Sequence, residues 1–132
     1  PGGTKRGMNP DNMIDLLRKN ISGHVRLVNG DGVEIIPGIT VYTGARHTFA
    51  SQYIRVAGNP AYVLASDNCM LYENLKSRRA SGSYFAPADA EAQVVALDRM
   101  VSLAGSPDRV IPGHDKLQFK LYPTKGRIAR IR

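Results

Sequence analysis

Residues 33–42 read Val-Glu-Ile-Ile-Pro-Gly-Ile-Thr-Val-Tyr, two short runs of mainly β-branched side chains separated by Pro37-Gly38. Such runs are typical of strands, and proline followed by glycine is typical of a break between them. Three more strand-like runs lie nearby, each bounded by turn-forming residues; they are residues 25–28, 51–56 and 62–65. Five short strands joined by tight turns predict a largely antiparallel sheet.

Helical spacing of apolar residues is found on both sides of these strands. Residues 87–104 place alanine, valine, leucine and methionine at helical spacing and end before Gly105, which predicts a helix. An earlier helix is predicted to begin near Pro10 and to end within residues 20–23, because proline suits the first helical turn. One more strand is predicted at residues 108–111. We therefore expect an α+β fold, a mostly antiparallel sheet with helices on one face.

The composition indicates a single globular domain. The chain has 132 residues and a mass of 14.4 kDa, with 42 % apolar and 22 % charged residues. No apolar run approaches the roughly 20 residues of a membrane span, and no signal-peptide pattern opens the chain, so no membrane partner is expected. The single cysteine, Cys69, excludes an internal disulfide and fits a cytoplasmic location. Because residue 1 is proline rather than methionine, we expect residues 1–132 to be a piece of a longer protein.

The net charge of +7 is concentrated near the C-terminus. Residues 116–132 hold six basic residues and no acidic one, which leaves the chain before Lys116 with a net charge of only +1. A basic tail can bind a phosphate backbone through counterion release. Neither aromatic–basic interleaving nor a recognition motif accompanies these charges, so a solvated or partner-facing tail is expected in preference to a nucleic-acid-binding one.

Three polar residues each follow a predicted strand, in a loop beside small or turn-forming residues. They are His47, Asp67 and His114. Loops at strand ends are where a rigid sheet presents functional groups. Two imidazoles and a carboxylate form a plausible divalent-metal set, because nitrogen and oxygen ligands suit zinc, iron or manganese. The two oxygens of a carboxylate can also bridge two ions.

The local sequences around these residues resemble the metallo-β-lactamase superfamily. Residues 43–52, Thr-Gly-Ala-Arg-His-Thr-Phe-Ala-Ser-Gln, resemble its Gly-His-Thr-Pro-Gly-Ser stretch, and residues 65–67 resemble its Ser/Gly-Asp segment. Residues 110–115 contain Pro-Gly-His, the motif that closes the family pattern. Asp67-Asn68 followed by Tyr72-Glu-Asn-Leu is most similar to the N-acyl-homoserine-lactone hydrolase branch. The resemblance covers roughly residues 24–124 and keeps the family order.

The resemblance implies both a fold and a chemistry. The family fold is a sandwich of two similar αβ halves, and this chain would be the C-terminal half with a short preceding helix. His47 would ligate one metal ion, Asp67 would bridge two, and His114 would ligate the second. Two divalent ions are implied, with zinc favoured and iron or manganese as alternatives, and the hydroxide between them would attack a lactone or ester carbonyl. Tyr72 would help to polarise that carbonyl, since Met70 stands where some lactonases carry a tyrosine.

Two departures from the family pattern leave alternatives open. The His-x-His-x-Asp-His metal signature is absent, and Arg46 stands where the family usually has glycine. We therefore expect the missing N-terminal half to lie upstream or on another chain, and the isolated chain to be inactive. A homo-oligomer is a further partner to consider. The alternative functions are a catalytically inert domain used for assembly or nucleic-acid binding, and a thioester hydrolase resembling glyoxalase II.

Overall fold

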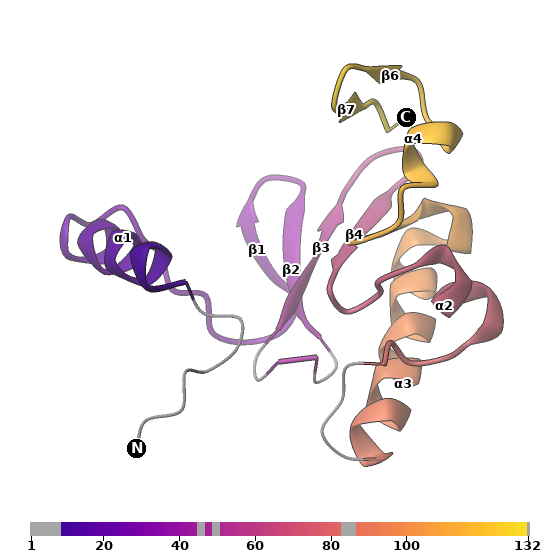
Figure 1. Cartoon of the computed structure of the whole chain (residues 1–132), viewed down its shortest axis with the longest axis horizontal. Coiled ribbons are helices and arrows are strands. Elements are labelled where there is room, and N and C mark those ends of the chain that lie inside the picture. The colour runs from indigo at the N-terminus through magenta and orange to yellow at the C-terminus, as the bar shows by residue number, and fades with distance from the viewer. Residues whose placement is uncertain (1–8, 45–46, 49–50, 83–86, 132) are drawn as a thin grey trace.

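The centre of the molecule is a five-stranded sheet (Figure 1). The computed structural model describes residues 9–44, 47–48, 51–82 and 87–131. The strands, which lie side by side in the order of the chain, are β1 (Val33–Ile36), β2 (Ile39–Thr43), β3 (Gln52–Val56), β4 (Tyr62–Ser66) and β5 (Val110–Pro112). Neighbours from β1 to β4 are antiparallel, whereas β5 runs parallel to β4. The sheet is mixed and the fold is α+β, as predicted at that level.

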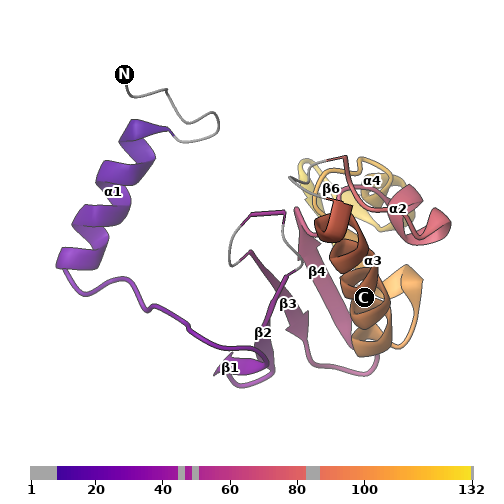
Figure 2. The same cartoon turned by 90° about the horizontal axis from the view of Figure 1, so that it is seen from below.

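Two helices lie between β4 and β5 in the chain, because a parallel pair needs a crossover connection. They are α2 (Tyr72–Ser77) and α3 (Pro87–Ala104), and both lie on the same side of the sheet (Figures 1 and 2). The helix predicted at residues 87–104 is thus confirmed. Since β4 and β5 run in the same direction, the residues that follow them emerge at the same edge of the sheet, and these residues include Asp67 and His114.

The hydrophobic core lies between the sheet and α3. Alternate side chains of the strands point towards the helix and are buried against it; the buried cluster comprises Tyr53, Val63, Ala65, Cys69, Ala96, Leu97, Met100, Ala104 and Val110. Leu75 of α2 packs against this cluster. The residues between these positions form a second apolar row on the other face, in register across four strands; they are Val41, Ile54, Leu64 and Ile111.

An ion pair and a ring contact join α3 to the loop before β1. The Arg99 guanidinium lies 2.7 Å from an Asp31 carboxylate oxygen and 5.0 Å from the centre of the Tyr42 ring. Tyr42 stacks in turn on the buried Tyr53, with ring centres 5.5 Å apart. A cation placed over an aromatic ring is stabilising, so this contact helps to hold β2 against α3.

The first helix, α1 (Pro10–Ile21), stands away from the sheet (Figures 1 and 2). The Asn9 side chain accepts a 2.9 Å hydrogen bond from the backbone N–H of Asp11, and Pro10 occupies the first turn, so the predicted start is confirmed. No residue of α1 is buried. Its large apolar side chains are between 45 % and 78 % exposed; they are Met13, Ile14, Leu16, Leu17 and Ile21.

One strand prediction was wrong and another was wrong in part. Residues 25–28 are irregular, and instead of a strand partner the Arg26 guanidinium donates to the carbonyl of Ile35. This segment links α1 to the sheet. Its Leu27 is 84 % exposed, so pairing of this segment as a strand is not stabilised by burial of that side chain. The last strand of the main sheet begins at Val110 rather than at residue 108, because residues 107–109 form a short 3-10 turn (η1, Pro107–Arg109).

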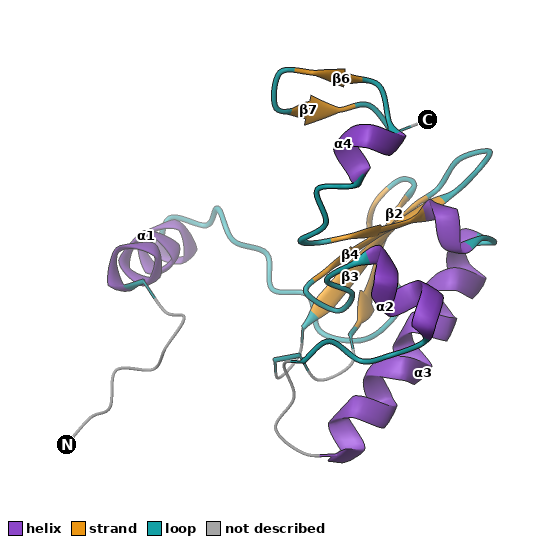
Figure 3. Cartoon of the chain, turned by 45° about the vertical axis from the view of Figure 1, so that its right-hand side comes forward, coloured by secondary structure: helices purple, strands orange, loops and turns teal. Residues whose placement is uncertain are grey.

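The basic C-terminal segment contains secondary structure that the sequence analysis did not predict. After the short helix α4 (Gln118–Leu121), strands β6 (Thr124–Lys125) and β7 (Ile128–Ala129) form a two-residue hairpin (Figure 3). Strands this short leave no periodic pattern in a sequence. In the described part of the chain, the helices lack the length and apolarity needed to cross a membrane.

Candidate functional site

The structure brings the three predicted polar residues together. The Nε2 atom of His114 lies 2.7 Å from Oδ1 of Asp67, and the Nε2 atom of His47 lies 3.4 Å from Oδ2. Each imidazole therefore faces a different oxygen of one carboxylate. The three residues come from three loops, which follow β2, β4 and β5.

The loop that carries Asp67 is a tight turn at the end of β4. Ser66 has a positive φ of 50°, and the backbone N–H groups of Asn68 and Cys69 donate to the carbonyls of Ala65 and Ser66 at 3.2 and 3.3 Å. This turn ends the strand abruptly and directs the Asp67 side chain out of the sheet edge, where it is 45 % exposed. A left-handed residue next to a functional group is a common form of local strain at sites.

Gly113 permits the close approach of the His114 loop to the Asp67 loop. The backbone N–H groups of Gly113 and His114 donate to the carbonyls of Cys69 and Met70 at 2.9 and 3.0 Å. A Cβ atom on Gly113 would lie 2.6 Å from the carbonyl oxygen of Ser66, closer than real contacts allow. The glycine of the Pro-Gly-His motif is therefore required for the distance between His114 and Asp67.

Asn68 fixes the third loop, which carries His47. Its side chain is 2 % exposed, donates to the carbonyls of Gln52 and Ala65 at 3.0 and 3.2 Å, and accepts from the Ser51 hydroxyl at 2.8 Å. The backbone N–H of Gly44 donates to the carbonyl of Ser51 at 2.6 Å, which closes the base of the loop. A Cβ atom on Gly44 would overlap the Asn68 side chain.

Sequence reasoning assigned no role to Asn68 or Gly44. The signals were present but weak: an asparagine directly after Asp67, and a glycine directly after a strand. Their function becomes visible only when the two loops are seen in contact, because Asn68 bonds to residues 16 and 17 positions away.

The donor atoms are of the types that bind divalent cations, but the distances between them do not all match those of a metal site. Two donors bound about 2.1 Å from a tetrahedral zinc ion lie about 3.4 Å apart. The separation between His47 and Asp67 equals this value, whereas the 2.7 Å contact between His114 and Asp67 is a direct hydrogen bond. Within the described ranges, no group of three or more His, Cys, Asp and Glu side chains is arranged to hold an ion.

The second ring nitrogen of His47 has no polar partner in the described structure. Nδ1 is buried and has no hydrogen-bond partner among the described residues, and the His47 side chain is only 16 % exposed. A buried imidazole without a second partner is unfavourable, so the contact of Nε2 with Asp67 is the one polar interaction that holds this ring in the described structure.

Tyr72, the predicted carbonyl-polarising residue, makes no contact with the Asp67 carboxylate. It begins α2, where its backbone N–H donates to Asp115 at 2.9 Å, and its hydroxyl is buried. Burial, followed by the neighbouring Tyr122, raises the pKa of Tyr72 above its ordinary value. Its catalytic role stays a prediction.

The remaining candidates lie elsewhere. Cys69 is buried, and burial followed by the charge of Asp115 raises the pKa of its thiol to about 12, so it is not a thiolate nucleophile at neutral pH. His24 lies just beyond α1, with Nδ1 2.8 Å from the Ser22 hydroxyl, and takes no part in the site. Arg46 lies outside the described residues.

The chain matches no known family model and no curated protein. The three converging side chains and the loops that hold them are therefore the features that bear on its function.

Proposed function

We propose that this chain forms part of a metal-dependent hydrolase that opens a lactone or a related ester. The observation that carries the proposal is the meeting of His47 and His114 on opposite oxygens of the Asp67 carboxylate. The resemblance of the surrounding motifs to the lactone-hydrolase branch of the metallo-β-lactamase superfamily supports the same reaction.

Each residue has a distinct role in this proposal. His47 and His114 would each ligate one divalent cation through Nε2, and Asp67 would bridge the pair with its two oxygens. Zinc is favoured, with iron or manganese as alternatives. Cations bound there would lower the pKa of a bound water towards neutrality and polarise a carbonyl oxygen. Asn68 and Gly113 hold the three loops against one another.

The proposed partner is an N-terminal half of the same fold. The sheet face away from α3 carries the apolar row of Val41, Ile54, Leu64 and Ile111, and α1 stands beyond that face with its apolar side chains exposed (Figure 2). Val41 and Ile111 of this row are already buried, so a second αβ half packed there would cover the half-buried Ile54 and Leu64 and the exposed side of α1. It would also supply the ligands that three residues cannot provide.

Zinc binding by the 132-residue chain tests the site. Competition with a chromogenic chelator should give an affinity that falls at least about 10-fold in Asp67→Asn and in His114→Ala, because the loss of a ligand should cost no less than the roughly 10- to 100-fold lost when a residue that only orients a ligand is removed. His24→Ala removes an imidazole outside the site and should leave the affinity unchanged. Equal affinity in all four proteins would contradict the metal site.

Lactone hydrolysis tests the reaction. The protein extended upstream should open a simple lactone, followed with a pH indicator, and the isolated chain should not. The direct hydrogen bond between His114 and Asp67 favours a second candidate, an inert domain used for assembly. Zinc binding without hydrolysis in the extended protein would support that inert domain and overturn the hydrolase.

A further inference from the structure

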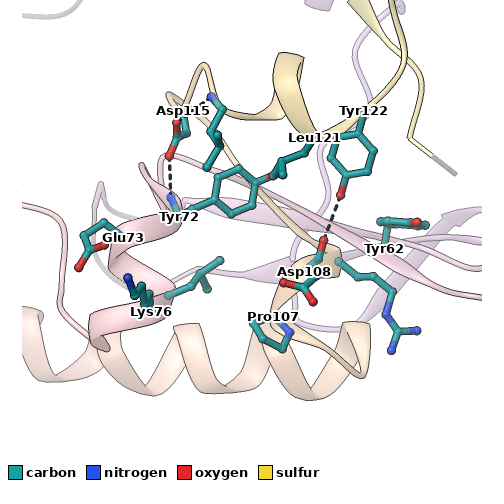
Figure 4. A pocket seen from close by; sticks show the side chains of 12 residues that line it. Tyr62, Tyr72, Glu73, Lys76, Pro107, Asp108, Asp115, Leu121 and Tyr122 are labelled. Carbon is teal, nitrogen blue, oxygen red and sulfur yellow. Dashed lines mark hydrogen bonds between the residues drawn. The ribbon is translucent and has the colours of Figure 1, made fainter.

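A second pocket lies apart from the three converging side chains (Figure 4). It has a volume of about 840 Å³ and lies between α2, the 3-10 turn η1 and residues 115–122. None of His47, Asp67 and His114 lines it. Three tyrosine rings line it together with aliphatic side chains; the rings are those of Tyr62, Tyr72 and Tyr122. Small-molecule sites in proteins typically enclose about 300–1,000 Å³ and are lined mainly by aromatic and apolar side chains.

The hydroxyl hydrogens of two of these tyrosines are used inside the protein. The Tyr122 hydroxyl donates to the backbone carbonyl of Asp108 at 3.0 Å. The Tyr72 ring crosses the pocket towards Tyr122, and a side-chain hydrogen bond joins the two residues (Figure 4). Because the Tyr122 hydrogen is already donated, Tyr72 is the donor in this bond. Neither hydroxyl therefore has a hydrogen left for an anion, whereas the ring faces can still attract a cation.

The charged groups around the pocket favour a positive occupant. Three carboxylates and two bases line it, which gives a net charge of −1; they are Glu73, Asp108, Asp115, Lys76 and Arg109. Lys76 lies three residues after Glu73 on α2, a spacing at which opposite charges offset each other. The Arg109 guanidinium lies at the end of α3, because a Cβ atom on Gly105 would be 3.2 Å from its Nη2 atom. Backbone carbonyls at the C-terminus of a helix attract a cation, so this guanidinium is already stabilised there.

The two remaining carboxylates act on the tyrosines directly. Burial is the first cause that raises the pKa of both Tyr72 and Tyr122 above the ordinary value. The charge of Asp115 adds to the rise in the pKa of Tyr72, and the charge of Asp108 adds to that of Tyr122. A negative potential that opposes the ionisation of a phenol also stabilises a cation placed beside its ring.

We propose that this pocket binds an organic cation, an alkylammonium ion with an apolar body. Its ammonium group would lie between the rings of Tyr62 and Tyr122, beside the Asp108 carboxylate, and its apolar body would lie against Leu75 and Leu121. This site is separate from the candidate metal ligands, so it stands whether or not the protein is a hydrolase.

Nuclear magnetic resonance titration of the ¹⁵N-labelled chain tests the proposal with three probes of one shape. They are 4-phenylbutylamine, which is cationic, 4-phenylbutan-1-ol, which is neutral, and 4-phenylbutanoate, which is anionic. The amine should shift the backbone signals of Tyr62, Leu75 and Tyr122 and bind at least about fivefold more tightly than the alcohol or the anion. Because the whole chain carries a net charge of +7, non-specific attraction would favour the anion instead.

Substitutions at Tyr62 separate the contribution of the ring from that of the hydroxyl. Tyr62→Leu removes the aromatic ring and should weaken amine binding about fivefold, with a smaller effect on the alcohol, because only the amine is attracted by the ring face. Tyr62→Phe keeps the ring and should bind the amine as tightly as the native chain.

Asp108→Asn tests the charge, since it keeps the shape of the side chain and the backbone carbonyl that accepts from Tyr122. It should weaken amine binding about threefold and leave alcohol binding unchanged. Glu91→Gln is the control, because Glu91 is an exposed acid of α3 that does not line the pocket. Equal binding of the three probes would overturn the proposal. So would amine binding that is unchanged in Tyr62→Leu or in Asp108→Asn, or that falls as much in Glu91→Gln as in Asp108→Asn.

Discussion

Replacement of Gly113 by alanine is expected to destabilise the fold by about 3 kcal/mol, because the added methyl group has no space. Its Cβ would lie 2.6 Å from the Ser66 carbonyl oxygen and 2.7 Å from the carbonyl carbon, and both belong to the backbone. A side chain could rotate away, but a backbone carbonyl at the end of β4 cannot move without shifting Asp67. The two hydrogen bonds from residues 113 and 114 to Cys69 and Met70 would lengthen as well.

Urea denaturation followed by circular dichroism measures this loss. Gly82→Ala is the matched control, because among the described residues no atom beyond the chain neighbours lies within 4 Å of a Cβ at that position, and it should change stability by less than about 0.5 kcal/mol. If Gly113→Ala were as stable as Gly82→Ala, the close approach of the two loops described above would be incorrect.

Asn68→Ala is the second change expected to have a large effect. It removes two hydrogen bonds donated to the carbonyls of Gln52 and Ala65 and one accepted from Ser51, at a position that is 2 % exposed. Carbonyl and hydroxyl groups left without partners in the interior should cost about 3 kcal/mol in total. Asn20→Ala, at an exposed position on α1, is the control and should be nearly neutral.

A double-mutant cycle with Gly44 tests the contact itself. Gly44→Ala should be strongly destabilising in the native background, because its Cβ overlaps the Asn68 side chain, and much less so beside Asn68→Ala. Additive effects of the two substitutions would show that Asn68 does not hold the base of the His47 loop.

Sequence patterns correctly predicted the helices and strands that are determined by neighbouring residues in the chain. Proline and glycine at residues 37–38 separate two strands, and the apolar spacing of residues 87–104 forms α3 as expected. Residues 25–28 have the composition of a strand but no neighbouring strand to pair with. Their composition therefore predicted a strand that the structure does not contain. The parallel pairing of β4 with β5 depends on contacts between residues 47 apart, such as Val63 with Val110, which no local pattern encodes.

The side chains of the candidate site could be predicted from the sequence, but the residues that hold its loops in place could not. His47, Asp67 and His114 share the context of a loop after a strand, which pointed to all three. Asn68 and Gly113 act across the space between loops, so their roles follow from the folded arrangement alone. Tyr72 lines a pocket between α2, η1 and residues 115–122 that is assembled from four separate segments of the chain, and for the same reason this position could not be predicted from sequence.

The central claim is that two imidazoles share the Asp67 carboxylate. Ring-nitrogen chemical shifts of the three histidines in the ¹⁵N-labelled chain, compared between the native protein and Asp67→Asn, test it directly. Because the substitution keeps the shape of the side chain and removes its charge, the ring signals of both His47 and His114 should move, and those of His24 should not. If only one of the pair responded, or if neither did, the claim would be contradicted.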